Sequence, residues 1–284
     1  MSKKTAFLTT IYPMKEEYLI NFLDSLSKQT FKNFHLIVVN DGYSDFYKMK
    51  KIYSSLHIKE LKFSNTPVKN RQHGLNFIIN NGYDTVFFGD SDDYFSSNRL
   101  ELVLNKLNNY DLVVNDISVF DNKGIYDRKY FSNRIENNTE ITIDFIKDKN
   151  IFGMSNTALN VSSLDNIDYD SDLIALDWYM FTLALLKSGV AIFTNEAETF
   201  YRQHNNNTVG IGKLNKEIFY KGVEVKLKQY ELLSKNHREF ESYLNEMIVL
   251  DDIIKKSDFL DSNFLKDIRY PFWWEQIKLI EEYK

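Results

Sequence analysis

The chain contains no cysteine, and glycine and proline are scarce, with 10 and 3 residues among 284. Without cysteine it has no disulfide framework, no thiolate zinc site and no cysteine nucleophile. Its 43% hydrophobic and 26% charged residues match ordinary globular usage, which excludes disordered and collagen-like chains. The length allows one large or two small domains with a substantial buried core.

The chain also lacks an excess of basic residues and a long apolar run, and both facts limit the partners and the location that we expect. Lys and Arg number 35 against 40 Asp and Glu, so the net charge of -5 gives no basic footprint for nucleic acid. No run is long and apolar enough to span a bilayer, and the short apolar run near the start is typical of a strand rather than a signal peptide. We therefore expect a cytoplasmic protein that binds no nucleic acid.

The first part of the chain alternates short β-rich apolar runs with helical periods. The expected strands are 6–11, 35–39, 59–63 and 85–88, and the expected helices are 16–29, 46–56 and 71–81. Strands that alternate with helices predict βαβ units and a parallel sheet. The apolar character of these runs fits strands that are buried on both faces.

The pattern changes further along the chain. The next expected elements are a helix at 100–107, a strand at 111–117, loop, hairpin and a short helix within 121–150, a helix at 177–187 and a strand at 190–193. From residue 215 only helical periods follow, including a last helix at 271–280 opened by Pro271. We therefore predict an α/β domain over 1–212 and a helical extension over 213–284.

A cluster of carboxylates follows the strand expected at 85–88. Asp90 and Asp92 lie one residue apart at a strand end, which is where open α/β sheets bind ligands. Such a pair can share Mg²⁺ or Mn²⁺, which bridges to phosphates and offsets the charge of a diphosphate leaving group. An acidic turn that caps the helix near Ser97 is the simpler alternative. The position after a buried strand favours the metal interpretation.

The order of several short motifs resembles the family 2 glycosyltransferases, inverting nucleotide-sugar enzymes of the GT-A fold. The motifs are Thr9-Thr10-Ile11, Glu16-x-Tyr18-Leu19, Ser25 to Thr30, Val39-Asn40-Asp41-Gly42, Arg71-x-x-Gly74-Leu75 and Asp90-Ser91-Asp92-Asp93. The similarity resumes at Leu176-Asp177-Trp178 and at 201–210, which is similar to a segment of bacterial, rhamnosyltransferase-like members. It implies a Rossmann-type, mainly parallel sheet with a nucleotide-binding half at 1–93 and an acceptor half at 94–212.

The resemblance also implies roles for single residues. Positions that match the donor site are Thr9, Thr10, Asp41, Arg71, Asp90 and Ser91. Asp92 and His204 match ligands of Mn²⁺ or Mg²⁺, and Asp177 matches the catalytic base. Trp178 and Arg202 are expected beside the acceptor. Leu176 replaces the glutamate that usually precedes the base, which bears on acceptor recognition.

The residues themselves leave simpler roles open for two of these positions. Inversion at an anomeric carbon needs a base opposite the leaving diphosphate, and a carboxylate at a helix start can serve. Asp177 at the head of its helix could instead only cap it. His204 could be a solvated loop residue.

The implied activity is metal-assisted transfer of a sugar from a UDP- or dTDP-sugar to a hydroxyl of a glycan or lipid-linked glycan, in the synthesis of bacterial surface polysaccharide or other glycan. A sugar nucleotidyltransferase is one alternative, but it should carry a glycine-rich phosphate loop, and 9–15 contains no glycine. An inactive nucleotide-sugar-binding or scaffold protein on the same fold is the other. The retention of the carboxylates and of His204 together argues against it.

The C-terminal tail is rich in aromatic residues. Trp273 and Trp274 beside basic residues could lie at the inner face of the cell membrane, near a lipid-linked acceptor. Glutamates offset that basic charge, and Trp273, Ile277 and Ile280 form one apolar stripe. We expect this stripe to pack on the domain instead.

Overall fold

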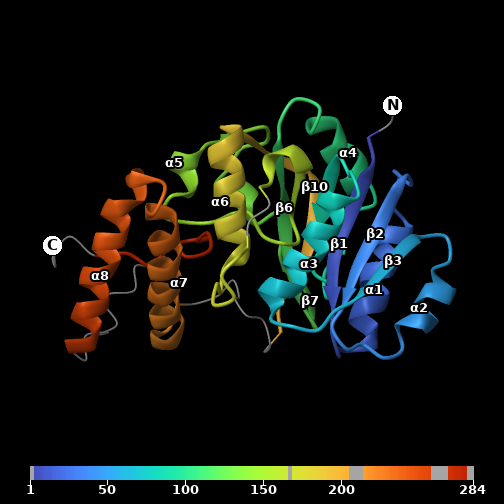
Figure 1. Cartoon of the computed structure of the whole chain (residues 1–284), viewed down its shortest axis with the longest axis horizontal. Helices are drawn as coiled ribbons and strands as arrows, with labels where there is room; N and C mark the ends of the chain where they lie inside the picture. Colours follow the sequence, from blue (N-terminus) through green and yellow to red (C-terminus); the bar gives the residue numbers. More distant parts are fainter. Residues whose placement is uncertain (1–2, 166–167, 205–213, 257–267, 280–284) are drawn as a thin grey trace.

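A ten-stranded sheet forms the centre of the protein (Figure 1). The computed structural model describes residues 3–165, 168–204, 214–256 and 268–279. Its strands are β1 (Thr5–Ile11), β2 (Phe34–Asn40), β3 (His57–Lys62), β4 (Thr85–Phe88), β5 (Tyr94–Phe95), β6 (Leu112–Asp121), β7 (Gly124–Asp127), β8 (Glu140–Ile141), β9 (Thr157–Asn160) and β10 (Ala191–Arg202).

Most of the long strands run in the same direction. The order is β3-β2-β1-β4-β9-β6-β10-β5, with β7 beside β6 and β8 beside β10. The first four pair in parallel, and β6 pairs in parallel with β10. Because β9 is antiparallel to both β4 and β6, those two strands also point the same way. The prediction of a mainly parallel sheet is therefore confirmed.

Helices cover both faces of the sheet (Figure 1). On one face α3 and α6 pack on side chains such as Leu8 and Phe88. On the other, α1, α2 and α4 pack on side chains such as Phe7 and Phe87. The alternation of a strand sends neighbouring residues to opposite faces, which gives the sheet two apolar layers. The helices are α1 (Glu16–Ser27), α2 (Phe46–Ile52), α3 (Pro67–Asn80), α4 (Arg99–Lys106), α5 (Ile143–Ile146), α6 (Leu176–Ser188), α7 (Lys216–Ser234) and α8 (Glu241–Lys256).

Several element bounds differ from the sequence-based expectation. α3 begins at Pro67 rather than at residue 71, because the Thr66 hydroxyl accepts the Lys69 N–H at 3.3 Å and Pro67 suits the first helical position. β10 extends to Arg202, far beyond residue 193, through a register shift between Thr194 and Glu198. Such a bulge interrupts the alternation that a pattern search uses. β9 is not predicted at all, because its four residues form neither an apolar run, as those of β4 do, nor an alternation.

The helices expected after residue 215 are confirmed as α7 and α8, which lie beside α6 at one end of the sheet (Figure 1). Asn215 caps α7 by accepting the Ile218 N–H at 2.8 Å. Their apolar faces enclose Trp178 of α6 in a shared core. None of the helices described is long and apolar enough to cross a membrane. The proposed boundary at 212/213 lies outside the described residues.

The helix expected at 271–280 is wrong. Residues 268–279 form turns, with one antiparallel bridge between Trp273 and Asn150. Tyr270 and Trp274 have φ values of 56° and 66°, which a right-handed helix does not allow. The expected packing on the domain is confirmed for Ile277, which is buried, and for Trp273, which is partly buried against the core of the domain. Ile280 lies outside the described residues. The side chains considered for a membrane surface thus lie largely inside the protein.

Candidate active site

The carboxyl ends of the parallel strands bring most of the predicted residues to one edge of the sheet. Thr9 and Thr10 lie near the end of β1, and Asp41 follows β2. Asp90 follows β4, and Arg202 ends β10. Ends of parallel strands meet at one edge because the strands share a direction. This is where open α/β sheets bind their ligands.

The loop after β4 is fixed by hydrogen bonds to its neighbours. Arg71 on α3 donates to Asp90 Oδ1 at 2.9 Å, and both side chains keep about a third of their surface exposed. The Asp90 N–H donates to Ser155 Oγ at 2.8 Å. Ser91 is buried and donates to the Thr10 carbonyl at 2.8 Å. The expectation that Ser91 contacts the donor is corrected: its hydroxyl fastens the loop to β1.

Asp92 and His204 are 112 residues apart in sequence, yet His204 Nε2 lies 2.9 Å from Asp92 Oδ2. The prediction that these two side chains meet is confirmed. The ring of His204 stacks on Tyr18, with centroids 5.7 Å apart. The side chains of Asp92 and His204 are 15% and 18% exposed, so His204 is not a freely solvated loop residue.

Arg202 holds this pair in place from the interior. Its Nε donates to the Asp92 carbonyl, and its N–H donates to Asp93 Oδ1, both at 2.7 Å. Its guanidinium lies over the rings of Tyr18 and Phe120, at 4.2 and 4.4 Å from their centroids. Arg202 is only 4% exposed. The expected acceptor contact at Arg202 is therefore corrected to a supporting role beneath the loop.

The loop concentrates negative charge. Burial raises the pKa of Asp93 well above its usual range, and Asp92 and Asp90 add to the effect. Burial also raises the pKa of Asp90, with Arg71 opposing and Asp92 adding to the rise. Carboxylates crowded in this way disfavour one another's charged forms. A cation at the loop would relieve that repulsion.

Asp177 lies in the first turn of α6, whose N-cap is Ala175 rather than Asp177. Asp177 is therefore not the N-cap residue of α6, although its carboxylate still bonds a backbone N–H of the first turn. Its Oδ1 accepts the N–H of Trp178 at 2.8 Å. Burial raises the pKa of Asp177 to about 6, against the lowering effects of that N–H and of Arg71, while Asp90 raises it further. The carboxylate thus lies within electrostatic reach of the Arg71–Asp90 pair.

Trp178 does not face the site. Its ring is 1% exposed, and its Nε1 donates to the Ile146 carbonyl at 3.0 Å. It meets Tyr230 of α7 edge to face, with centroids 6.0 Å apart. An expected acceptor contact at Trp178 is therefore wrong. Successive side chains of a helix point in different directions, so Trp178 packs under α7 although Asp177 precedes it directly.

A second polar group surrounds Asp41. Its carboxylate accepts from Ser64 Oγ at 2.5 Å and from Asn70 Nδ2 at 2.8 Å. Among the described residues, Asn70 Oδ1 and the hydroxyls of Thr9 and Thr10 are buried with no hydrogen-bond partner in the protein. Buried polar atoms without partners are costly, so each of these three is a candidate contact for a polar ligand.

A small pocket lies beside the Arg71–Asp90 pair. It opens between β1, β4 and α3 and is lined by Thr9, Thr10, Arg71, Gly89, Asp90 and Met154. A side chain on Gly89 would place Cβ 2.6 Å from the Phe7 ring, so only glycine lets the backbone pass at this point. Four residues predicted for the donor site thus line a single pocket.

Comparison with known proteins identifies the family. The model described as glycosyl transferase family 2 matches residues 9–166, more than half of the chain. The chain belongs to glycosyl transferase family 2. The predicted membership of family 2 is thereby confirmed, and the match spans Asp41, Arg71 and the Asp90–Asp93 loop.

Curated relatives of this family 2 chain resemble it over short stretches. It is 30% identical over 125 residues to the teichoic acid poly(glycerol phosphate) polymerase of Staphylococcus epidermidis, covering 42% of this chain and 17% of that protein. It is 32% identical over 111 residues to glycosyltransferase GlyA of Streptococcus pneumoniae, covering 36% and 15%. The chain therefore matches less than a fifth of the length of either relative.

Solved structures agree on the fold. S. aureus TarS 1–349 in complex with UDP-GlcNAc matches with a TM-score of 0.64 at 18% identity, over 93% of this chain and 76% of that one. GalNAc-T7 with UDP, GalNAc and Mn²⁺ matches with a TM-score of 0.55 at 9% identity, over 86% and 54%. These likenesses support the fold, and the predicted GT-A-like architecture is confirmed.

The family implies a divalent cation, and the donor atoms at the loop are compatible with one. No group of three or more His, Cys, Asp or Glu side chains in the described parts has the arrangement of a metal site. A cation here would therefore rest on the carboxylate of Asp92 and the imidazole of His204. Mg²⁺ is commonly held by one or two carboxylates together with substrate phosphates and water. Asp92 and His204 therefore fit a metal ion whose remaining ligands would come from a bound diphosphate and water.

Sequence reasoning missed several residues of the site. Asn70 and Ser155 orient Asp41 and Asp90 from within the core. Tyr12 follows β1, and burial, with Asp92 and Asp90 adding, raises its pKa to about 12. Tyr201 lies beside the same carboxylates. Tyr201 begins the segment 201–210 that resembles the family. The direction of its side chain, however, depends on the register of β10, which the sequence does not show.

Proposed function

We propose that this chain is an inverting glycosyltransferase that moves a sugar from a UDP- or dTDP-sugar to a hydroxyl of a glycan or lipid-linked glycan. The observation that carries the proposal is the grouping of three parts at one sheet edge. These are the Arg71–Asp90 pair, the Asp92–His204 pair, and the carboxylate of Asp177 with its raised pKa.

The nucleoside of the donor would occupy the polar group around Asp41. Its carboxylate can accept a hydrogen bond from a base N–H or a ribose hydroxyl. The buried oxygens of Thr9, Thr10 and Asn70 would then gain the partners that the protein itself does not provide. Arg71 can reach the nucleotide from α3, since its guanidinium lines the pocket beside Asp90.

The diphosphate would lie against the loop after β4. Mn²⁺ or Mg²⁺ held by Asp92 and His204 would supply positive charge to the leaving diphosphate. Arg202 fixes the backbone of this loop from below, so the two ligands keep their separation. The aromatic ring of Tyr18 supports His204 from the side of α1.

Asp177 would take the proton of the acceptor hydroxyl. A pKa of about 6 leaves its carboxylate mainly ionised at neutral pH, yet closer to that of an ideal base than an exposed aspartate. The oxygen that loses this proton attacks the anomeric carbon, and the bond from that carbon to the diphosphate breaks on the opposite face. One displacement of this kind inverts the anomeric centre.

The comparisons support this class of donor and acceptor. TarS has been solved with UDP-GlcNAc and with UDP. The relatives named above include a teichoic acid polymerase of Staphylococcus epidermidis and a glycosyltransferase of Streptococcus pneumoniae. A role in the synthesis of a bacterial surface glycan is therefore part of the proposal.

A thermal-shift screen of UDP, dTDP and GDP, each with and without Mn²⁺, tests the donor site. A ligand that binds the native state raises the unfolding temperature. We expect UDP or dTDP to do so more strongly with Mn²⁺. No shift for any nucleotide would overturn the proposal.

An inactive binding protein would give the same shifts, so a second assay is needed. Slow release of UDP or dTDP from a nucleotide sugar in the presence of Mn²⁺, weakened by Asp177→Asn, is expected of the enzyme. Binding without any release, in wild type and variant alike, would favour the inactive scaffold.

A further inference from the structure

Tyr201 has a place in the site that the proposed roles above do not use. It precedes Arg202 on β10, and neighbouring strand residues point to opposite faces. The Arg202 guanidinium lies over Tyr18, on the α1 side of the sheet. The Tyr201 ring therefore lies on the α6 side, where it packs against the core that contains Phe181. That is also the side from which Asp177 approaches.

The phenol of Tyr201 lies within electrostatic reach of the acidic groups of the site. Burial raises the pKa of Tyr201 well above its usual range, and Asp93, Asp90, Asp92 and Asp177 each add to the rise. Arg71 likewise lies within electrostatic reach of both the loop after β4 and Asp177. The region between the diphosphate site and the base is where the transferred sugar must lie.

The ring of Tyr201 is supported by a residue from far along the chain. Trp273 meets it edge to face, with centroids 5.9 Å apart and planes at 76°. The Trp273 carbonyl accepts the Asn150 N–H at 2.9 Å. A Cβ placed on Gly153 would lie only 3.1 Å from Trp273 Cη2. The indole is thus wedged between Tyr201 and the segment that leads to Met154 in the pocket wall.

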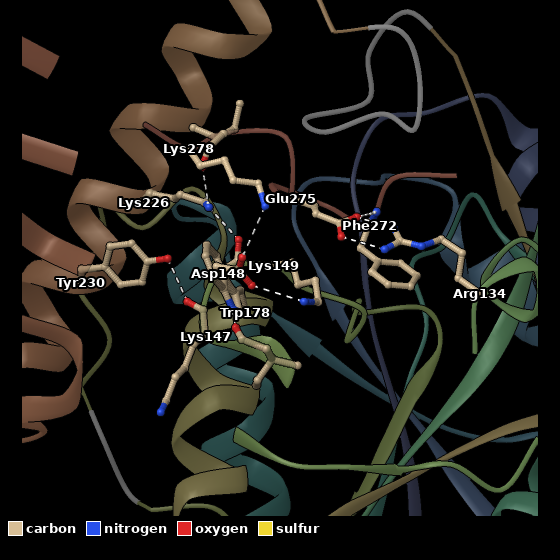
Figure 2. Close-up of polar contacts among 12 residues, drawn as sticks. Arg134, Lys147, Asp148, Lys149, Trp178, Lys226, Tyr230, Phe272, Glu275 and Lys278 are labelled. Atoms are coloured by element: carbon tan, nitrogen blue, oxygen red, sulfur yellow. Dashed lines mark hydrogen bonds and ion pairs between the residues drawn. The ribbon is translucent and has the colours of Figure 1, made fainter. Parts of the chain in front are cut away.

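The segment that carries Trp273 is anchored on both sides (Figure 2). Arg134 forms a two-point ion pair with Glu275 and lies over the ring of Phe272, at 4.2 Å from its centroid. The buried amine of Lys226 donates to the Asp148 carbonyl at 2.6 Å and to the Ile277 carbonyl at 2.7 Å. These contacts fix the backbone on either side of the indole.

We propose that Tyr201 lines the subsite of the transferred sugar and that Trp273, from the C-terminal segment, is the positioning residue that holds the Tyr201 ring there. This inference rests on the proposed function, because it needs a nucleotide sugar in the site. A tyrosine offers an apolar ring to the face of a sugar and a hydroxyl that can bond to sugar hydroxyls. The C-terminal segment thus completes the site.

The test compares affinities for a nucleotide with and without its sugar. Calorimetry with Mn²⁺ gives Kd for UDP and dTDP, and for UDP-glucose, UDP-galactose, UDP-N-acetylglucosamine and dTDP-glucose. In Tyr201→Phe and Trp273→Leu, the affinity for the best nucleotide sugar should fall about five- to tenfold, as for the loss of one hydrogen bond. The affinity for the bare nucleotide should stay within about twofold of wild type. Trp273→Phe keeps an aromatic edge and should recover most of the loss.

Ile277→Ala is the matched control. Ile277 lies in the same segment but packs against Gly222 of α7, away from Tyr201. It should lower the unfolding temperature, as Trp273→Leu does, without changing the ratio of the two affinities. A purely structural role for Trp273 predicts the wild-type ratio in Trp273→Leu as in Ile277→Ala, and that result would overturn the inference while leaving the proposed function intact. If wild type binds none of these nucleotides, the proposed function and the inference fail together.

Discussion

At the scale of single residues, Asp177 is the sharpest test of the proposed chemistry. Asn fills the same volume and can still accept the Trp178 N–H, but it cannot take a proton. Loss of a general base should lower the transfer rate by about 10²–10⁴-fold, while donor affinity stays unchanged. Steady-state transfer assays and calorimetry on Asp177→Asn measure the two quantities. A variant that transfers at the wild-type rate would move the base elsewhere, with Asp172 and Asp170 the next candidates.

The pKa of Asp177 also predicts a pH dependence. The group must be ionised to act, so kcat/KM of the free enzyme should fall about tenfold per pH unit below pH 6. Stability should move in the opposite direction. Because burial raises the native pKa above the ordinary value of 3.8, this group favours folding at low pH and loses that contribution as the pH rises through about 6. An acid limb near pH 4 instead of 6 would contradict the assignment.

Asp92 allows a test of the metal site. Asp92→Ala removes the carboxylate but leaves the backbone carbonyl that Arg202 holds. We expect Mn²⁺ to stop enhancing nucleotide binding, with at most a small change in unfolding temperature. Isothermal titration with and without Mn²⁺ measures this, and Asp168→Ala, on the surface, is the control. Unchanged metal enhancement in Asp92→Ala would place the cation elsewhere.

The identity of the site residues was more predictable than their orientation. Asp92 and His204 were expected to meet because motif order implied it, and they do. Trp178 and Arg202 were expected at the acceptor, but both are buried. Sequence shows which residue types follow a strand or start a helix. It does not show which way the third residue of α6 or the last residue of β10 points, because tertiary packing decides that.

At the scale of elements, α7 is tied to the domain by a buried lysine. Lys226 is 1% exposed, and burial lowers its pKa from the ordinary 10.5 to about 7, although Asp148 opposes the shift. Between those two values the unfolded chain binds more protons than the native protein. Stability therefore rises with pH across that window, by up to about 1.4 kcal/mol per pH unit from this group.

Lys226→Met isolates that contribution. The methionine fills similar space but leaves the carbonyls of Asp148 and Ile277 without their donor, which costs about 1–3 kcal/mol per group. Denaturant unfolding of wild type and variant at pH 7 and pH 9 should show the variant less stable at both. The difference should widen at pH 9, since only wild type gains from the lysine. A difference that is constant with pH would show that Lys226 is not buried in this way.

The elements that were predicted wrongly share a cause. The tail from Pro271 has the composition of an amphipathic helix, but Glu275 instead accepts the Phe272 N–H at 3.0 Å and pairs with Arg134. These long-range partners favour a turn over the helix that the local pattern indicates. β10 likewise extends through a bulge because β6 offers it a partner along its whole length. The helical spacing of apolar residues predicted α1 and α6 well, because the apolar faces of these two helices pack directly on the sheet.

At the scale of the whole molecule, the helical extension and the α/β domain share one core. Trp178 of α6 lies under Tyr230 of α7, and Trp273 reaches from the C-terminal segment to Tyr201 on β10. The sequence indicated two units because its periods change from mixed to purely helical near residue 215. The contacts between the units, by contrast, join residues far apart in the chain, and no local pattern reports them.

This arrangement predicts that the chain unfolds in a single cooperative step. Its three tryptophans are Trp178, Trp273 and Trp274, and each belongs to or borders the core that the extension shares with α6. Tryptophan fluorescence therefore reports the contact region between the helical extension and the α/β domain, called the seam here. Far-ultraviolet circular dichroism, by contrast, reports all helices and strands. If the seam is integral to the fold, the two signals should change with the same midpoint on heating, and calorimetric and van't Hoff enthalpies should agree.

A fluorescence midpoint several degrees below the dichroism midpoint would mean that the extension separates first, as an independent domain would. The same scan with UDP and Mn²⁺ connects seam and site, because a ligand bound next to Tyr201 should raise both midpoints together.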